Sequence, residues 1–167
     1  MTDPLDAPAQ IGRMAAAAAT FAGLRDAIRA GEPWPIKIAA GDGPEADWGP
    51  TEVLAHTAEM LQFWLGEIER VLAGGPEPVP FGRVATDQLR ILTIERDRTL
   101  PGAELISRIQ SSVARYGDRL PELSAADWQK RGLHPRQGEM TIEAILERFV
   151  VSHIDDHAAQ LREALSR

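Results

Sequence analysis

Long stretches in which apolar residues recur every three or four positions limit the possible folds of this sequence more than any other feature. Such spacing places apolar side chains along one face of an α-helix. No stretch of comparable length alternates between apolar and polar residues, as a half-buried β-strand would. The sequence therefore predicts an all-α protein. The helices are expected at residues 9–30, 50–72, 85–98 and 101–120, and from residue 142 towards the C-terminus.

Several residues mark where these helices begin and end. Gly31, followed by Glu-Pro-Trp-Pro, ends the first helix. Pro50 fits the first position of the second helix, where its missing N–H costs nothing. Thr141 is a natural N-cap for the last helix, and Met140 with Ile145 fits a hydrophobic staple around it.

The predicted helices are expected to form one bundle. The chain has 167 residues, the length of one ordinary domain, so residues 1–167 are expected to fold as a single domain. Residues 124–128 fit a short helical turn, and residues 130–140 fit a polar connection. Long helices with short connections predict an antiparallel up-and-down four-helix bundle, whose third helical region is in two pieces.

Composition limits the chemistry and the partners. The absence of cysteine excludes disulfides, thiolate metal ligands, iron–sulfur clusters and a cysteine nucleophile, so a metal would need histidine, carboxylate or carbonyl ligands. A formal net charge of −7 offers no basic surface to a phosphate backbone, so no nucleic-acid partner is expected. No signal peptide and no apolar run near the roughly 20 residues that span a bilayer is visible, so we expect a cytoplasmic protein without a membrane partner.

Two histidines stand four residues apart on the last predicted helix. His153 and His157 project into its apolar stripe, whereas Arg148, Asp155 and Arg162 project to the opposite side. Two imidazoles on one buried face need hydrogen-bond partners or a metal, because each unsatisfied polar group costs about 1–3 kcal/mol. The i, i+4 spacing is the one that zinc-binding helices use.

His56 is the candidate for a third ligand, because it flanks the apolar stripe of the second helix. His134 stands beside Pro135 in a predicted loop, so it is expected to be solvated and to take no part in metal binding. The spacing of the three inward histidines is equally compatible with a divalent metal site and with hydrogen-bonded core histidines.

Two carboxylates are weaker site candidates. Glu52, one turn before His56, could accept the second ring N–H of that histidine, but a first-turn Glu favoured by the helix dipole is the preferred interpretation. Asp156 lies at the edge of the apolar stripe and could orient His153 or act as a base; a solvated role is as plausible. Asp155 faces away and is expected to be solvated.

Several other site templates are absent. Ile154 follows His153, so the sequence lacks the Glu of the His-Glu-x-x-His metalloprotease motif. No Glu-x-x-His pair is present, which argues against a di-iron bundle. Phosphate-binding loops, dinucleotide fingerprints and Gly-x-Ser-x-Gly are also missing. Core or loop anchoring is the expected role of the four tryptophans, Trp34, Trp48, Trp64 and Trp128.

Two segments resemble the DinB/YfiT-like superfamily of bacterial four-helix-bundle proteins. They are DWGPTEVLAH, residues 47–56, and GEMTIEAILERFVVSHIDDHAAQL, residues 138–161. The family pattern has a Trp, then Glu and His four residues apart on the second helix, and His-x-x-x-His on the last helix. The matching residues of this chain are Trp48, Glu52, His56, His153 and His157.

This resemblance implies one divalent metal, often nickel or zinc, held by His56, His153 and His157, and frequently a homodimer. Some relatives, such as mycothiol-dependent maleylpyruvate isomerases, have Glu in place of the first histidine of the last helix. This chain keeps His153 and is therefore closer to the three-histidine branch. The family's activities include thiol-dependent transferases and isomerases and metal-dependent hydrolases.

Three imidazoles leave a divalent ion its full charge and an open coordination position, which is typical of a catalytic site. The first hypothesis is therefore a metal-dependent enzyme that acts on a small electrophile with an external low-molecular-weight thiol, since the chain has no cysteine. A metal-dependent hydrolase is the next alternative. The third is a metal-stabilised module that binds a small molecule without turning it over.

Overall fold

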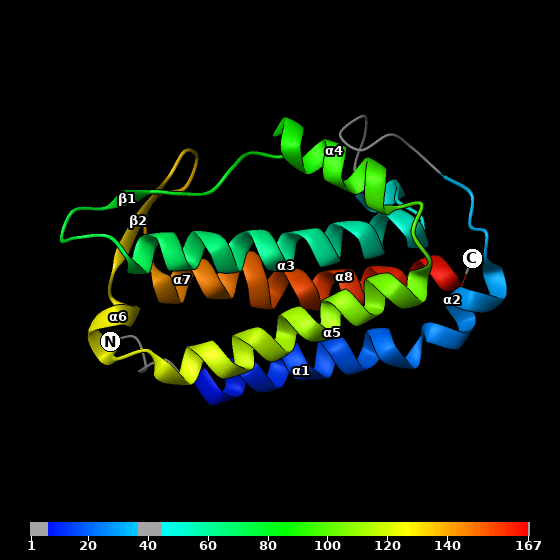
Figure 1. Cartoon of the computed structure of the whole chain (residues 1–167), viewed down its shortest axis with the longest axis horizontal. Coiled ribbons are helices and arrows are strands. Elements are labelled where there is room, and N and C mark those ends of the chain that lie inside the picture. The colour runs from blue at the N-terminus through cyan, green and yellow to red at the C-terminus, as the bar shows by residue number, and fades with distance from the viewer. Residues whose placement is uncertain (1–6, 37–44, 167) are drawn as a thin grey trace.

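Four long helices form a bundle in the computed structural model, which describes residues 7–36 and 45–166 (Figure 1). Three of them are α1 (Ala7–Gly23), α3 (Pro50–Leu72) and α5 (Gly102–Arg119). The fourth consists of α7 (Ile142–Leu146), a π-helical turn and α8 (Ser152–Leu165). Helices α3 and α1 both pack against α5 and α8. The all-α class and the four-helix bundle are confirmed.

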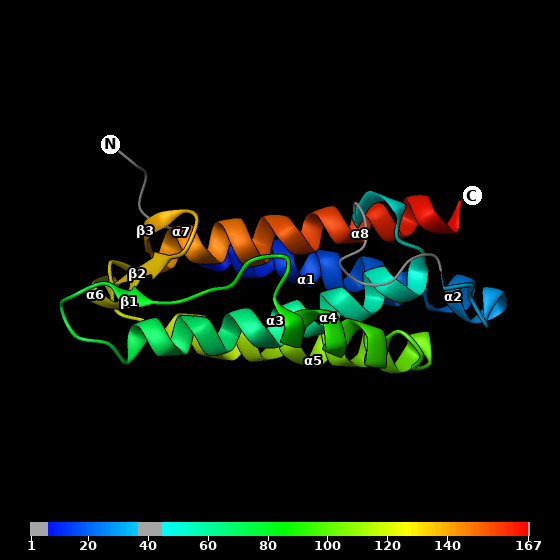
Figure 2. The ribbon, with the colours of Figure 1, turned by 90° about the horizontal axis from the view of Figure 1, so that it is seen from above.

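The long connection between α3 and α5 is more elaborate than the short ones expected. It contains α4 (Gln88–Asp97), which packs on α3 outside the bundle. The connection returns the chain along the bundle, so that α3 and α5 run in the same direction, while α1 and α8 run in the opposite one (Figures 1 and 2). The helices therefore do not follow the expected up-and-down order, because this long crossover takes the place of a short turn.

A small three-stranded sheet closes one end of the bundle, where the sequence analysis expected polar connections. Its strands are β1 (Val79–Pro80), β2 (Arg131–His134) and β3 (Gly138–Thr141). Strand β1 pairs with β2 in parallel, and β2 and β3 form an antiparallel hairpin. Strands of two to four residues are too short to show an alternating pattern, and the partner of β1 is far away in the sequence, so no local signal predicts the sheet.

Short helices fill the remaining connections. The first expected helix is interrupted at Leu24, after which α2 (Arg25–Gly31) begins. The others are the 3₁₀ helices Glu45–Asp47 and Leu120–Glu122 and the helix α6 (Ala125–Trp128), which matches the expected turn.

The expected helix starts at Pro50 and Thr141 are both present. Pro50 is the first residue of α3, and the Thr141 hydroxyl accepts a hydrogen bond from the backbone N–H of Ala144 at 3.2 Å. These caps fix the ends of the two helices that carry the histidines.

Interlocking apolar side chains hold the bundle together, and some of the polar groups among them are paired. Tyr116 is fully buried and donates its hydroxyl to the backbone carbonyl of Leu61 at 2.8 Å. Of the tryptophans, Trp48, Trp64 and Trp128 are buried, whereas Trp34 anchors its loop through an indole hydrogen bond. Within the described ranges, no helix has the length and apolar character needed to span a bilayer.

Candidate metal centre

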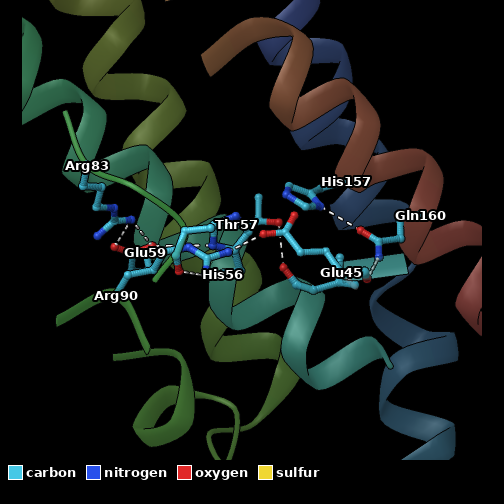
Figure 3. Close-up of polar contacts among 10 residues, drawn as sticks. Glu45, His56, Thr57, Glu59, Arg83, Arg90, His157 and Gln160 are labelled. Atoms are coloured by element: carbon cyan, nitrogen blue, oxygen red, sulfur yellow. Dashed lines mark hydrogen bonds and ion pairs between the residues drawn. The ribbon is translucent and has the colours of Figure 1, made fainter. Parts of the chain in front are cut away.

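Three of the four histidines meet between α3 and α8. The ring centroids of His56 and His153 are 5.4 Å apart, those of His56 and His157 are 4.9 Å apart, and those of His153 and His157 are 4.6 Å apart. Figure 3 shows His56 and His157 approaching each other from the two helices. The i, i+4 pair and the histidine of the second helix therefore converge on one point.

The ring nitrogens of these histidines fit a divalent cation. Within residues 7–36 and 45–166, both nitrogens of His56 and Nε2 of His157 are buried without a hydrogen-bond partner. Each such group costs about 1–3 kcal/mol when it is left unpaired. A fold that leaves nitrogens of two facing histidines unpaired in one place calls for a ligand that uses the lone pair of each ring, and zinc and nickel both bind imidazole nitrogen.

Burial keeps the three imidazoles neutral. It lowers the pKa of His56 well below the ordinary value, and the neighbouring His157 and the charge of Arg90 lower it further. Burial also lowers the pKa of His153 to about 4, although the carboxylate of Glu45 opposes this shift. The pKa of His157 is lowered in the same way. A neutral imidazole has the free lone pair that metal coordination requires.

The π-helical turn Glu147–Val151 sets the direction in which the two histidines of the last helix point. A π turn adds one residue to a regular helix and rotates everything after it by about 100°. The centre of the apolar stripe therefore passes to Ile154 and Leu161, which are fully buried. His157 is buried at the edge of this stripe and His153 is half-buried, so the pair faces the pocket and His56 of α3 rather than the centre of the core.

A buried ion pair lies beside His56. Glu59, one turn further along α3, places a carboxylate oxygen 3.6 Å from Nδ1 of His56. The Arg83 guanidinium donates to this carboxylate at 2.7 Å and stacks on the ring of Phe63. A carboxylate next to one ring nitrogen fixes the tautomer and orientation of a ligating histidine. This arrangement leaves Nε2 of His56 for a metal.

Glu52, the carboxylate considered from the sequence, is fully buried in the first turn of α3. It accepts a hydrogen bond from the Thr51 hydroxyl at 2.9 Å, and one of its oxygens lies 3.9 Å from the Arg98 guanidinium. Its role towards His56 stays a prediction, while Glu59 is a neighbour that the sequence analysis missed.

Gln160 connects His157 to the segment that precedes α3. Its side-chain oxygen lies 2.8 Å from Nδ1 of His157, and its amide nitrogen donates to the backbone carbonyl of Glu45 (Figure 3). When Nδ1 carries the proton it donates to Gln160, and the unpaired Nε2 is then free for a metal.

Glu45 brings a carboxylate that the sequence analysis did not single out. It begins the 3₁₀ helix Glu45–Asp47, and its ligand atom and those of the three histidines all lie within 4.8 Å of one another. The guanidinium of Arg90, from α4, forms an ion pair with it. The structure thus adds a fourth potential ligand to the three expected from the sequence.

A pocket of about 420 Å³ opens beside the histidines. Asp156 is exposed on its wall and therefore lies close to the site. Asp155 is not simply solvated as expected, because it pairs with Arg13 of α1 at 2.8 Å. The pocket is lined by Glu45, Trp48, His153, Asp156, His157, Gln160, Glu163 and Ala164.

The prediction that His134 is solvated is wrong. Strand β2 turns this side chain into the closed end of the bundle, where it is only 5% exposed and stacks on Phe149 with the ring centroids 5.0 Å apart. Its Nδ1 accepts hydrogen bonds from the backbone N–H groups of Arg136 and Gln137, both at 3.2 Å. His134 lies outside the group of potential metal ligands in the described chain, and its absence from metal binding stays a prediction.

Comparison with known proteins agrees with the four-helix fold. No curated protein sequence matches the chain. Among solved structures, YfiT from Bacillus subtilis, described as a "probable metal-dependent hydrolase with an unusual four-helix bundle topology", is similar with a TM-score of 0.71. The two are 16% identical, and the similarity covers 100% of this chain and 91% of YfiT.

The sequence profile of the DinB superfamily matches residues 33–161. This range includes His56, His153 and His157, the helices that carry them and the crossover between those helices. The chain belongs to the DinB superfamily.

Proposed function

We propose that this protein is an enzyme that uses one divalent metal ion, nickel or zinc, to act on a small molecule. The observation that carries the proposal is the convergence of His56, His153 and His157 beside a pocket of about 420 Å³, with unpaired buried nitrogens on His56 and His157. When bound there, the ion supplies a Lewis acid with its full charge, because all three imidazoles are neutral.

The reaction proposed first is transfer to, or isomerisation of, a small electrophile with a low-molecular-weight thiol as cosubstrate. The chain has no cysteine, so the thiol must come from outside. The guanidinium groups of Arg83 and Arg90 near the histidines are each paired with a carboxylate, Glu59 and Glu45. The charge that favours an anionic ligand such as a thiolate is therefore that of the bound metal ion.

Hydrolysis is the second candidate. YfiT is described as a probable metal-dependent hydrolase, and Glu45 places a carboxylate among the potential ligand atoms, where it could accept a proton from water. Peptide cleavage is disfavoured, because Ile154 occupies the position of the metalloprotease glutamate.

The proposal is tested with a panel of bacterial thiols, electrophiles, esters and amides. The panel is run on metal-loaded wild type, metal-free protein and His56→Ala, with His134→Ala as the matched control, because that histidine lies outside the potential ligand group. Turnover that needs the thiol, the metal and His56 supports the first candidate. Thiol-independent ester or amide cleavage supports hydrolysis. Ligand binding without any turnover would favour the binding module.

The proposal also includes a homodimer, which the family resemblance implies. Sedimentation equilibrium of the metal-loaded protein tests this part separately, and a mass close to that of the 18.2 kDa chain would contradict it.

A further inference from the structure

The inference concerns the coordination of the proposed metal and rests on that proposal. The ligand atoms of Glu45 and the three histidines lie within 4.8 Å of one another. In a tetrahedral zinc site with bonds near 2.0–2.1 Å, ligand atoms stand about 3.3 Å apart. Small rotations of the side chains therefore bring the group to coordination distance without movement of α3 or α8.

Two contacts from different elements hold Glu45 in this position. Arg90 of α4 forms an ion pair with its carboxylate and also donates to the backbone carbonyl of Ala85 at 3.1 Å. Gln160 of α8 donates to the backbone carbonyl of Glu45, and its side-chain oxygen contacts Nδ1 of His157. Glu45 is thus tied both to a buried cation and to one of the expected metal ligands.

Glu45 differs from the histidines in how firmly it is held. Its side chain is 39% exposed and stands on a helix of three residues. His56 and His157, in contrast, are only 2% and 3% exposed and belong to long helices of the bundle. A ligand on a short, exposed segment can leave the metal while the other three stay in place.

We infer that Glu45 is a fourth protein ligand to the metal and the exchangeable one. In the resting protein its carboxylate fills the position that opens to the pocket. An incoming anion, such as a thiolate, takes that position, and Glu45 withdraws while it stays paired with Arg90. The charge at the metal is unchanged by this exchange, because one anion replaces another.

The test compares cobalt(II) binding to wild type, Glu45→Gln and Asp47→Asn. Asp47 is an exposed carboxylate in the same 3₁₀ helix, so its variant controls for the loss of one negative charge. The visible absorption of bound cobalt reports the number and type of its ligands. Glu45→Gln should change this spectrum and weaken binding by at least about 10- to 100-fold. Residues that only hydrogen-bond a metal ligand already contribute that much to affinity, so a direct ligand should contribute no less. Asp47→Asn should match the wild type in both measurements.

Each of the other outcomes is informative. A spectrum and affinity of Glu45→Gln equal to those of the wild type would overturn the inference and leave the proposed function intact. An equal loss in Glu45→Gln and Asp47→Asn would also overturn it, because the effect would then be one of general charge. Failure of the wild type to bind cobalt or zinc would overturn the proposed function together with the inference.

Chemical rescue tests the exchange. In Glu45→Ala loaded with cobalt, added acetate should occupy the vacated position and move the spectrum towards that of the wild type. Chloride at the same ionic strength serves as the control. Absence of any acetate-specific change would overturn the assignment of an exchangeable carboxylate position.

Discussion

At the scale of single residues, the four histidines divide into two roles. Replacement of His56, His153 or His157 by Ala should abolish stoichiometric binding of one divalent ion, because two imidazoles hold a metal far less tightly than three. His134→Ala should keep full stoichiometry but lower the free energy of unfolding by about 2–4 kcal/mol, because it empties a packed aromatic site. Metal analysis after chelator stripping and reloading, together with urea unfolding, separates the two effects. Full stoichiometry in His153→Ala would show that the ligand assignment is wrong.

Glu59 provides a second prediction at this scale. Glu59→Gln should weaken metal binding by about 10- to 100-fold, because the carboxylate beside Nδ1 of His56 is lost. It should also lower the free energy of unfolding by about 3–5 kcal/mol, because Arg83 is left buried without its counter-charge. Isothermal titration with zinc and urea unfolding measure the two changes.

The control for this prediction is Glu69→Gln on the same helix. Glu69 pairs with Arg119 at the surface, where its side chain is 42% exposed. Its replacement should change the free energy of unfolding by no more than about 1 kcal/mol and leave metal affinity unchanged. Equal effects of the two variants on metal affinity would contradict the role given to Glu59.

The three histidines of the site could be found from the sequence because helical periodicity fixes which face a residue occupies. Glu45 and His134 could not be interpreted correctly in the same way. Glu45 lies before the first residue of α3 in a segment without periodicity, and it reaches the site only because Arg90 and Gln160 hold it there. The burial of His134 depends on a strand whose partners are set by tertiary structure.

At the scale of elements, the π turn in the last helix contains one residue more than a regular α-helical turn. Deletion of the exposed Arg148 should convert residues 147–151 into a regular α-helical turn and leave the helical phase of His153 and His157 unchanged. Insertion of one Ala after Arg148 should rotate both histidines by about 100° and abolish metal binding.

Far-UV circular dichroism and metal content measure these two variants, and each is the control of the other. The deletion variant should bind metal at full stoichiometry, and both variants should stay helical. Metal binding by the insertion variant, or loss of metal binding in the deletion variant, would show that the orientation of His153 and His157 does not depend on this turn.

The π turn also explains where element-level prediction failed. A constant 100° per residue along the last helix predicts that the two histidines lie inside the buried stripe, whereas the π turn moves them to its edge. The N-cap Thr141 and the apolar stripe predicted that this helix exists and where it starts, because both are local properties of the sequence. A π turn within an otherwise regular helix leaves no local composition signal, since it depends on how the two flanking segments pack.

At the scale of the whole molecule, the buried histidines make the stability of the metal-free protein depend on pH. Burial lowers the pKa of His56, His153 and His157 in the folded state, that of His153 to about 4. Unfolding restores values near 6.5, so the unfolded chain binds more protons in the window between them. The contribution of these neutral histidines to the free energy of unfolding is therefore fully present above about pH 6.5 and is lost as pH falls towards 4.

Urea unfolding of the metal-free protein at pH 7 and pH 4.5 measures this dependence. His153 alone should account for about 2 kcal/mol of the difference in the free energy of unfolding between pH 7 and pH 4.5. His153→Gln should therefore show a smaller difference than the wild type. Equal pH dependence of the two proteins would contradict the buried, neutral state of this histidine.

Bound metal should add stability that is also lost in acid, because protons compete with the ion for the imidazoles. The gain in melting temperature on zinc binding should be largest near pH 8 and shrink towards pH 5. Melting curves of loaded and stripped protein across this range measure it. A gain that does not change between pH 8 and pH 5 would contradict ligation by histidine.

The bundle as a whole could be predicted because each long helix carries its own signal of length, face and ends. The small sheet and the parallel course of α3 and α5 could not, because both depend on the path of the connection at residues 73–101, and that path is set by tertiary contacts rather than by the local pattern that predicts its helix. The pairing of Val79 with Gly132 joins segments on either side of α5, and such long-range pairing leaves no trace in a local window.

The crossover between α3 and α5 has a kinetic consequence for folding. In a bundle of successive hairpins most contacts join neighbours in the sequence, and such proteins of low contact order fold fast. Here α3 and α5 are parallel, and β1 reaches its partner strand only after a large chain loop has closed. Closing that loop costs chain entropy before the contacts that compensate for this cost have formed. The refolding rate should therefore lie below that of simple helical hairpin bundles of equal length, although the secondary structure is almost entirely helical.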